Sequence, residues 1–248
     1  MKLKIFLEYD GTRYSGWQKQ KNARTVQGTL ITAAETVFRK SKGGSRLIDL
    51  QGSGRTDSGV HAIEQVAHIE CDTMIAPHIL KFKINDELPS DINILEIEKA
   101  DSRFHARHSA LSRQYLYRIS KRRTAFEKKY VWWIKDTLNL SRIKSAAELF
   151  TGMKDFKSFS EPDKDEKSTK VLVESLEVKE EGDLVLIRIK ASHFLWKMVR
   201  RITGILAECG RGNIGNKEIT DFFHTYSEIP AGYTAPPSGL FLEKVFYK

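Results

Sequence analysis

The chain has 248 residues, of which 40% are hydrophobic and 29% charged, which fits a globular protein of one large or two small domains. Its 41 Lys and Arg residues outnumber its 32 Asp and Glu residues, so the formal net charge of +9 favours a polyanionic partner, nucleic acid first. The sequence has no long apolar span and only two distant cysteines, Cys71 and Cys209. These features argue against a membrane-spanning helix, a disulfide scaffold and a thiolate zinc site, and they predict a cytoplasmic protein.

The first half of the chain predicts a split βαβ unit. Its opening residues alternate and carry Glu8 and Asp10, which indicates a first strand and not a signal peptide. Thr25 is a suitable N-cap for one helix, and Pro77 suits the first turn of another. The predicted strands cover residues 2–9, 46–50, 63–71 and 91–100, and the predicted helices cover residues 25–40 and 77–87. The order β-α-β-β-α-β is that of a ferredoxin-like unit.

The second half nearly repeats this order. Its predicted strands cover residues 110–120, 130–135, 171–178, 184–189 and 240–247, and its predicted helices cover residues 141–150, 195–209 and 216–226. Gly152 lies just past the end of one helix, and Glu181-Gly182 predicts a hairpin turn. The charged stretch 160–168 predicts a surface loop. We therefore expect two α+β domains, residues 1–104 and 105–248.

One polar loop, residues 51–62, gathers three glycines with an arginine, an aspartate and a histidine between two predicted strands. Asp57-Ser58-Gly59 is suited to a tight turn in any loop. Gly52-x-Gly54 suggests a phosphate loop, but the third glycine and the following helix of a dinucleotide site are missing. The triplet is also that of aspartic proteases, which need two such carboxylates. Only a homodimer would supply the second, so this alternative is the weaker one.

The whole motif is more specific than its parts. Residues 54–62 read Gly-Arg-Thr-Asp-Ser-Gly-Val-His-Ala and resemble the active-site motif of the tRNA pseudouridine synthase A (TruA) family, in which the aspartate is catalytic. Four further segments resemble that family in the same order, namely residues 9–18, 85–92, 104–117 and 194–204. Ser58 stands where many members have Ala, and Lys170 where Arg is common. The stretch past residue 216 adds little to the resemblance.

The resemblance implies an α+β fold of two ferredoxin-like halves. Their strands would join into one mixed, mostly antiparallel sheet, with helices on one side and a basic cleft between the halves. It implies an isomerase that converts uridine to pseudouridine in the anticodon arm of tRNA, at positions 38 to 40. The enzyme would need no metal or other cofactor and would be a homodimer. A non-catalytic RNA-binding protein of the same fold is the main alternative.

The resemblance also assigns roles to single residues. Asp57 would be the catalytic carboxylate, acting as a nucleophile or by taking a ribose proton. Tyr115 would stack on the substrate, and Arg200 would pair with the aspartate. Arg55 would hold a phosphate or take the place of the extruded base. From the residues alone, a core or sheet-face aromatic is the favoured interpretation of Tyr115. For Arg55, a surface arginine is about as well supported as a substrate-binding one.

A run of basic residues surrounds the predicted domain junction. The residues expected to bind RNA phosphates are Arg107, Arg113, Arg122 and Arg123, within a run that also holds Arg103 and Lys121. His61, His105 and His108 lack the spacing of a metal site, so we expect hydrogen-bonded or surface histidines. Tyr14 and Trp17 suit either base stacking or the core, and the sequence does not decide between them.

Overall fold

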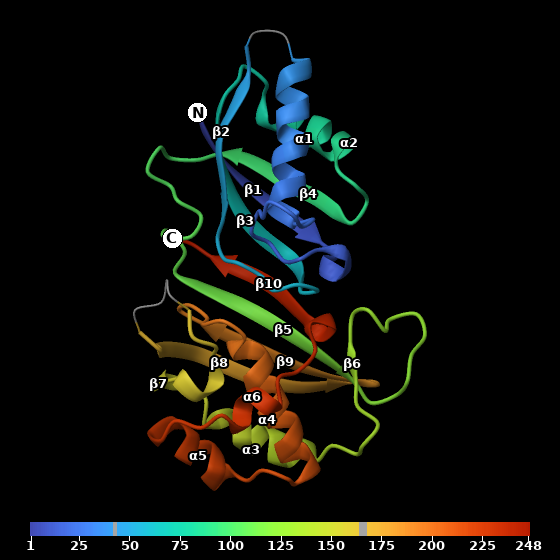
Figure 1. Cartoon of the computed structure of the whole chain (residues 1–248), viewed down its shortest axis with the longest axis vertical. Helices are drawn as coiled ribbons and strands as arrows, with labels where there is room; N and C mark the ends of the chain where they lie inside the picture. Colours follow the sequence, from blue (N-terminus) through green and yellow to red (C-terminus); the bar gives the residue numbers. More distant parts are fainter. Residues whose placement is uncertain (42–43, 164–167) are drawn as a thin grey trace. The chain divides into compact units, whose positions relative to one another are not determined.

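The computed structural model describes residues 1–41, 44–163 and 168–248, and within them it has six α-helices and ten strands of a mixed, mostly antiparallel sheet (Figure 1). The predicted α+β class is therefore confirmed. The described chain forms two compact units, Met1–Leu111 with Leu242–Lys248, and Ser112–Phe241. The division after Leu111 differs from the predicted boundary after residue 104, and the end of the last strand is part of the first unit.

The first unit has the predicted β-α-β-β-α-β order. Its elements are β1 (Lys2–Tyr9), α1 (Val26–Lys40), β2 (Arg46–Gly52), β3 (His61–Asp72), α2 (Pro77–Glu87) and β4 (Ile92–Lys99). Strand β1 lies between β4 and β3, and β2 pairs with β3; all of these pairs are antiparallel. In the register of the central strand, Ile5 lies opposite Ala67 on one side and Ile97 on the other. This is the strand order of a split βαβ unit.

Both helices of this unit begin where their capping residues predict. The Thr25 side-chain oxygen accepts the Gly28 N–H at 3.2 Å and so satisfies one free donor of the first turn of α1. Helix α2 begins at Pro77, whose missing N–H costs nothing at that position. The predicted apolar face of α1 is buried, and α1 packs beside α2 (Figure 1). The buried residues on that face include Leu30, Ala33, Ala34 and Val37.

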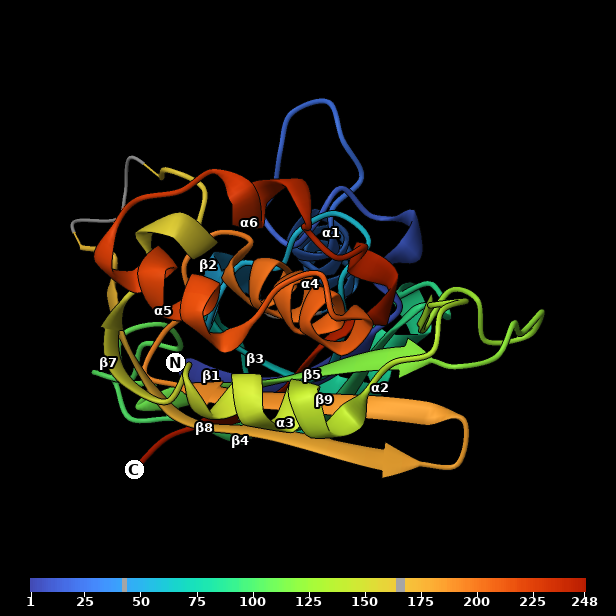
Figure 2. The same cartoon turned by 90° about the horizontal axis from the view of Figure 1, so that it is seen from below.

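The second unit contains most of the remaining elements. They are β5 (Ser112–Ser120), β6 (Trp132–Trp133), α3 (Leu140–Glu148), β7 (Gly152–Asp155), β8 (Lys170–Glu181), β9 (Leu184–Ala191), α4 (Met198–Arg211), α5 (Asn216–His224) and α6 (Ile229–Gly232). The strand order is β5-β9-β8-β7, and β8 and β9 form the predicted hairpin around Gly182, which has φ +58°. Figure 2 shows α3, α4 and α5 grouped beside these strands. Strand β10 (Leu240–Phe246) crosses the division between the units.

Several predicted bounds in this unit were wrong. The strand predicted at 130–135 is only Trp132–Trp133, because it pairs in parallel with just the last two residues of β5. The helix predicted from residue 195 begins at Met198, because Lys197 has φ +61° and is left-handed. Strand β7 and helix α6 were not predicted. Part of the predicted loop 160–168, residues 164–167, lies outside the described residues.

Two further findings concern the chain as a whole. In the part of the chain that the structure describes, no helix is long and apolar enough to cross a membrane. Cys71 and Cys209 are both free thiols, and both are buried. Burial raises the pKa of Cys209 to about 12, with the Glu218 and Glu208 carboxylates adding to the shift, so this thiol remains protonated.

Candidate active site

The loop that carries Asp57 links β2 to β3, and we call residues 53–60 the Asp57 loop. Asp57 is half-buried, whereas Arg55 is exposed. The Val60 N–H donates to the Asp57 carbonyl oxygen at 3.1 Å, and Gly59 has φ +78°. The Asp-Ser-Gly triplet thus forms a tight turn, as its composition predicts. The turn and the candidate site are the same structure, because the turn presents the Asp57 side chain.

The segment after β1 holds the Asp57 loop on both sides of the aspartate. Before it, the Trp17 N–H donates to the Thr56 carbonyl oxygen at 3.0 Å. After it, the Gly59 N–H donates to the Tyr14 carbonyl oxygen at 3.3 Å, and the Ser58 hydroxyl donates to the same oxygen at 3.1 Å. Residues 10–17, which we call the opening segment, therefore fix the backbone of the loop.

Two glycines of the opening segment make this close approach possible. A Cβ atom at Gly16 would lie 2.6 Å from the Thr56 carbonyl oxygen, and the residue has φ +86°. A Cβ atom at Gly11 would lie 1.9 Å from the carbonyl oxygen of Val60. Since real Cβ atoms do not approach backbone oxygens so closely, both positions require glycine.

A buried polar network supports the loop from beneath. The hydroxyls of Tyr9 and Thr56 are 2.8 Å apart, and the Ser53 hydroxyl donates to Gln65 Oε1 at 2.7 Å. Gln65, which is fully buried, also donates through Nε2 to the Gly54 carbonyl oxygen at 3.1 Å. Burial raises the pKa of Tyr9 to about 12, so its hydroxyl keeps its proton. The sequence does not predict this network, because glutamine and serine in a strand and a loop give no signal of burial.

Tyr14 and Trp17 belong to the core, which decides the alternative that the sequence left open. Each is only 2% exposed. The Tyr14 hydroxyl donates to Asp91 Oδ1 at 2.5 Å and accepts from Arg24 Nη2 at 3.0 Å. Burial, together with Asp91, raises the pKa of Tyr14 to about 12. Neither ring is available to stack on a base, and both instead anchor the opening segment.

The histidines make hydrogen bonds within the first unit. His61 is buried, and its Nδ1 accepts the Gly11 N–H at 3.1 Å. The rings of His68 and His105 lie 4.6 Å apart, and those of His105 and His108 lie 4.3 Å apart. Desolvation lowers the pKa values of His68 and His105, which favours their neutral forms. Among the described residues, no group of three or more His, Cys, Asp or Glu side chains is arranged to hold a metal ion.

The other two expected site residues lie in the second unit. Tyr115, on β5, is 9% exposed, and its ring meets Phe194 edge-on at 4.9 Å. Arg200, on α4, is half-buried, and its Nε donates to the Ala235 carbonyl oxygen at 2.7 Å. The Ala235 N–H in turn donates to the Arg200 carbonyl oxygen at 3.0 Å. Arg200 is thus a held side chain, not a solvated one. That Tyr115 and Arg200 meet Asp57 stays a prediction.

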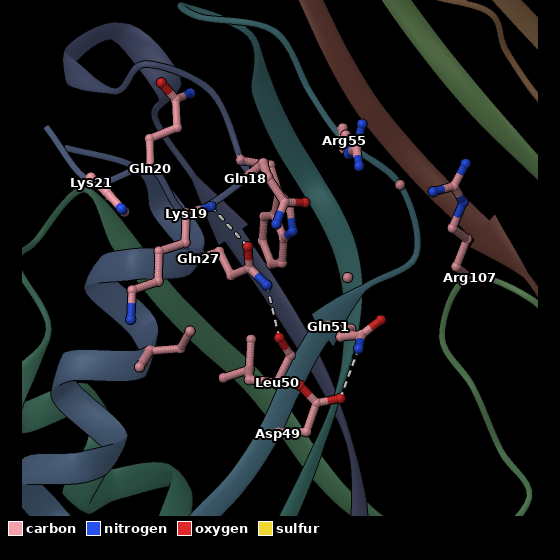
Figure 3. Close-up of a pocket in the computed structure, with 14 residues that line it drawn as sticks. Gln18, Lys19, Gln20, Lys21, Gln27, Asp49, Leu50, Gln51, Arg55 and Arg107 are labelled. Atoms are coloured by element: carbon pink, nitrogen blue, oxygen red, sulfur yellow. Dashed lines mark hydrogen bonds between the residues drawn. The ribbon is translucent and has the colours of Figure 1, made fainter. Parts of the chain in front are cut away.

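The arginines expected to bind RNA differ in their surroundings. Arg107 is exposed and, with Arg55, lines a pocket of about 620 Å³ in the first unit (Figure 3). Arg122 is exposed, and its Nε donates to Asp183 at 2.6 Å, while the Arg123 guanidinium lies 5.8 Å from the Trp133 ring centroid. Arg113 donates to the Ser192 carbonyl oxygen at 3.2 Å. Their contacts with RNA stay predictions.

The match to a known family covers both units. The family model described as "tRNA pseudouridine synthase" matches residues 5–109 and 146–248, which include the Asp57 loop and helix α4. The chain therefore belongs to the tRNA pseudouridine synthase family, an isomerase family, and the resemblance drawn from the sequence motifs is confirmed.

Individual relatives narrow this assignment. A protein of Thermoanaerobacter sp. (strain X514), named tRNA pseudouridine synthase A, is 38% identical over 245 residues, which is 98% of each chain. Proteins of the same name from Clostridium botulinum (strain Alaska E43 / Type E3) and Bartonella tribocorum are each 37% identical, over 247 and 251 residues, with 99% of both chains covered. Full-length similarity to these isomerases leaves the aspartic protease alternative without support.

Proposed function

We propose that this protein isomerises uridine to pseudouridine in the anticodon arm of tRNA, at positions 38 to 40, and that Asp57 is its essential carboxylate. Family membership supports the reaction and the tRNA substrate. The observation that carries the role of Asp57 is the fixing of its loop on both sides, by Trp17 before it and Tyr14 after it. A catalytic group must be held in its productive geometry, and the hydrogen bonds before and after Asp57 hold the backbone of its loop.

The proposed reaction conserves every atom of the substrate. The bond between C1′ of the ribose and N1 of uracil breaks, the base turns, and C1′ bonds to C5; the C5 proton leaves and N1 gains a proton. An ionised carboxylate serves either route, as a nucleophile or as the base that takes a ribose proton. Because the product is an isomer of the substrate, no oxidant, reductant or group donor enters the balance. We accordingly propose a reaction without a cofactor.

The remaining roles follow the same proposal. Tyr115 stacks on the target base, Arg200 pairs with Asp57, and Arg55 holds a phosphate or occupies the space that the base leaves. The held guanidinium of Arg200 and the exposure of Arg55 are consistent with these roles. We further propose a homodimer that acts on tRNA in the cytoplasm.

Replacement of the carboxylate tests this function. Asp57→Asn keeps the side chain's shape but lacks the charged oxygen, so we expect a folded protein that binds tRNA and makes no pseudouridine. Asp57→Glu misplaces the carboxylate by one methylene and is expected to lower the rate about 10²-fold. Pseudouridine would be mapped in tRNA incubated with each purified variant, and binding and thermal unfolding would be measured in parallel.

Ser58→Ala is the matched control for these variants. It changes the neighbouring side chain of the same turn and removes only the hydrogen bond from Ser58 to the Tyr14 carbonyl oxygen. We expect it to retain turnover. If Asp57→Asn made pseudouridine at a rate near that of the wild type, Asp57 would not be the catalyst.

A further inference from the structure

The pocket shown in Figure 3 is a second candidate site in the first unit, and we call it the amide pocket. The opening segment and the residues after it, helix α1, strand β2, the start of the Asp57 loop and Arg107 all contribute to its lining. Its volume of about 620 Å³ lies within the range of sites for small organic ligands. It therefore has room for one nucleotide.

The frame of the amide pocket is built by a buried glutamine. Gln27 is 6% exposed, and its Oε1 accepts the Lys19 N–H at 2.9 Å while its Nε2 donates to the Leu50 carbonyl oxygen at 2.8 Å (Figure 3). One amide thus ties the segment after Trp17 to strand β2. Trp17 packs so closely on Gly52 that a Cβ there would lie 2.6 Å from the indole ring. These contacts within the protein hold the walls of the pocket in place.

The chemistry of the lining suits a nucleotide of an RNA strand. Four cationic side chains and one carboxylate, Asp49, face the pocket, which leaves a positive site; the cations are Lys19, Lys21, Arg55 and Arg107. Three exposed amides, Gln18, Gln20 and Gln51, offer acceptor oxygens and N–H donors, as base edges require. Gln51 Nε2 donates one N–H to Asp49 Oδ2 at 2.8 Å and Gln20 Nε2 donates one to the Ser15 carbonyl oxygen at 3.3 Å, so each keeps a second N–H for a ligand. Cations bind phosphates and amides bind bases, so the two sets together fit both parts of a nucleotide.

The cations lie on two opposite sides of the pocket. Figure 3 shows Arg55 and Arg107 on one side of the pocket and Lys19 and Lys21 on the other. A single nucleotide within a strand has one phosphate on each side of its sugar, so both phosphates would meet positive charge. A free nucleoside monophosphate has only one phosphate and would leave one side unmatched. The pocket therefore favours a nucleotide within a chain.

The location links this pocket to the proposed chemistry. Gly54 and Arg55 line it and are only two or three residues from Asp57 in the same loop. A Cβ added at Gly54 would meet nothing within 4 Å, so the backbone there is open to a ligand. We propose that the amide pocket binds an unstacked nucleotide that neighbours the target uridine in the RNA strand. This inference rests on the proposed function, since it takes RNA as the substrate at Asp57.

Crosslinking tests the proposal directly. An anticodon-arm RNA would carry 4-thiouridine at one of the positions beside the target, and irradiated complexes with the full-length protein would be digested and sequenced by mass spectrometry. We expect crosslinks within residues 17–21 or 49–55 for at least one of these positions. Crosslinks that fall only elsewhere would overturn the inference.

A variant that fills the pocket provides a second test of the proposal. Ile31, half-buried on α1, lines the pocket, and Ile31→Trp would occupy it without changing any charge. We expect the Kd for the RNA to rise about tenfold, the size of effect that losing one good base contact produces, and the crosslink to disappear. Ile79→Trp is the matched control, because Ile79 is an exposed isoleucine on α2 that does not line the pocket. Equal affinity of the two variants would contradict the proposal.

Two further measurements keep the outcomes distinct. If Ile31→Trp melts far below the wild type, the double variant Gln18→Ala/Lys21→Ala, which truncates two exposed side chains, replaces it with the same expected rise in Kd. Pseudouridine would be measured in the same samples. Wild-type product with crosslinks outside the pocket would refute this inference alone, whereas pocket crosslinks without any product would refute the proposed function and leave the RNA site standing.

Discussion

The environment of one backbone oxygen shows what fixes the candidate site at the scale of single residues. The Thr56 carbonyl oxygen accepts the Trp17 N–H, and the space beside it is free only because residue 16 is glycine. The aspartate next in the chain therefore depends on residues some forty positions away in sequence. This dependence makes Gly16 a sensitive position.

Gly16→Ala is expected to lower both stability and turnover. A side chain at φ +86° costs about 1–2 kcal/mol, and the contact with Thr56 adds overpacking of about 1–3 kcal/mol. Gly152→Ala is the control, since Gly152 also has a positive φ, +95°, but its Cβ would meet nothing within 4 Å. Urea unfolding of both variants separates the two costs. Equal losses of stability would show that the Asp57 loop can shift away from the new Cβ atom at no cost in free energy.

Tyr115 offers a second test at this scale. Tyr115→Phe keeps the ring, whereas Tyr115→Ala loses both ring and hydroxyl. Base–aromatic stacking is worth roughly 1–3 kcal/mol, so we expect Ala to raise the Kd or lower the turnover about tenfold or more beyond Phe. Because the ring packs on Phe194, the unfolding free energy of each variant must be measured beside its activity. Equal effects of the two changes would assign the role to the hydroxyl.

At this scale the sequence singles out Asp57 as the candidate carboxylate but gives no sign of the residues that hold its loop. The nine-residue motif is a local feature, so it was visible in the chain. The burial of Tyr14, and the buried amides of Gln27 and Gln65, depend on segments that meet only in the folded unit. Polar residues carry no periodic signal of burial, which is why Gln27 and Gln65 were missed and the place of Tyr14 was left open.

At the scale of elements, local signals predicted the starts of helices best. Thr25 and Pro77 fixed α1 and α2, because capping acts within one turn. The two-residue strand β6 ended short because its length depends on its partner β5. Helix α4 began late because Lys197 adopts a left-handed conformation that a lysine rarely takes.

At position 197, glycine should stabilise the protein more than alanine, which is the reverse of their usual order within a helix. The left-handed conformation costs a residue with a Cβ about 1–2 kcal/mol, and glycine avoids that cost. We expect Lys197→Gly to be about 1 kcal/mol more stable than Lys197→Ala, since both lose the ion pair with Glu161 but only glycine relieves the strain. At Lys144, which is exposed within α3, the Lys144→Ala variant should instead be about 1 kcal/mol more stable than Lys144→Gly. Denaturant unfolding of the four variants measures both differences in the free energy of unfolding. If the Ala variant were the more stable one at both sites, Lys197 would be unstrained.

At the scale of the whole molecule, the order of motifs along the chain was enough to predict the fold class and the family. Composition contributed only the net charge of +9 and the expectation of an acidic partner. The division between the units fell after Leu111 and not after residue 104, and β10 contributes to the first unit. Such a return of the chain is a tertiary property that no local pattern encodes.

The net charge predicts a steep salt dependence of tRNA binding. The logarithm of the binding constant should fall with the logarithm of salt concentration; the slope per neutralised phosphate is about −0.9 for duplex DNA and shallower for single strands. Arg122→Ala/Arg123→Ala should flatten this slope. The control is Arg39→Ala/Lys40→Ala, which also removes two positive charges. Each double variant breaks one ion pair, Arg122 with Asp183 in the first and Lys40 with Glu87 in the control. Fluorescence titration at several salt concentrations gives the slopes. An unchanged slope for the first pair would place the RNA surface elsewhere.

The double anchoring of the Asp57 loop has a consequence for the proposed action on several neighbouring uridines. A loop fixed before and after its aspartate, by Trp17 and Tyr14, cannot travel to meet targets at different heights along a stem. The carboxylate is a stationary point, so each substrate must be brought to it. Under the proposed function, the adaptability therefore resides in the nucleic acid, and the most deformable anticodon arms should be the best substrates.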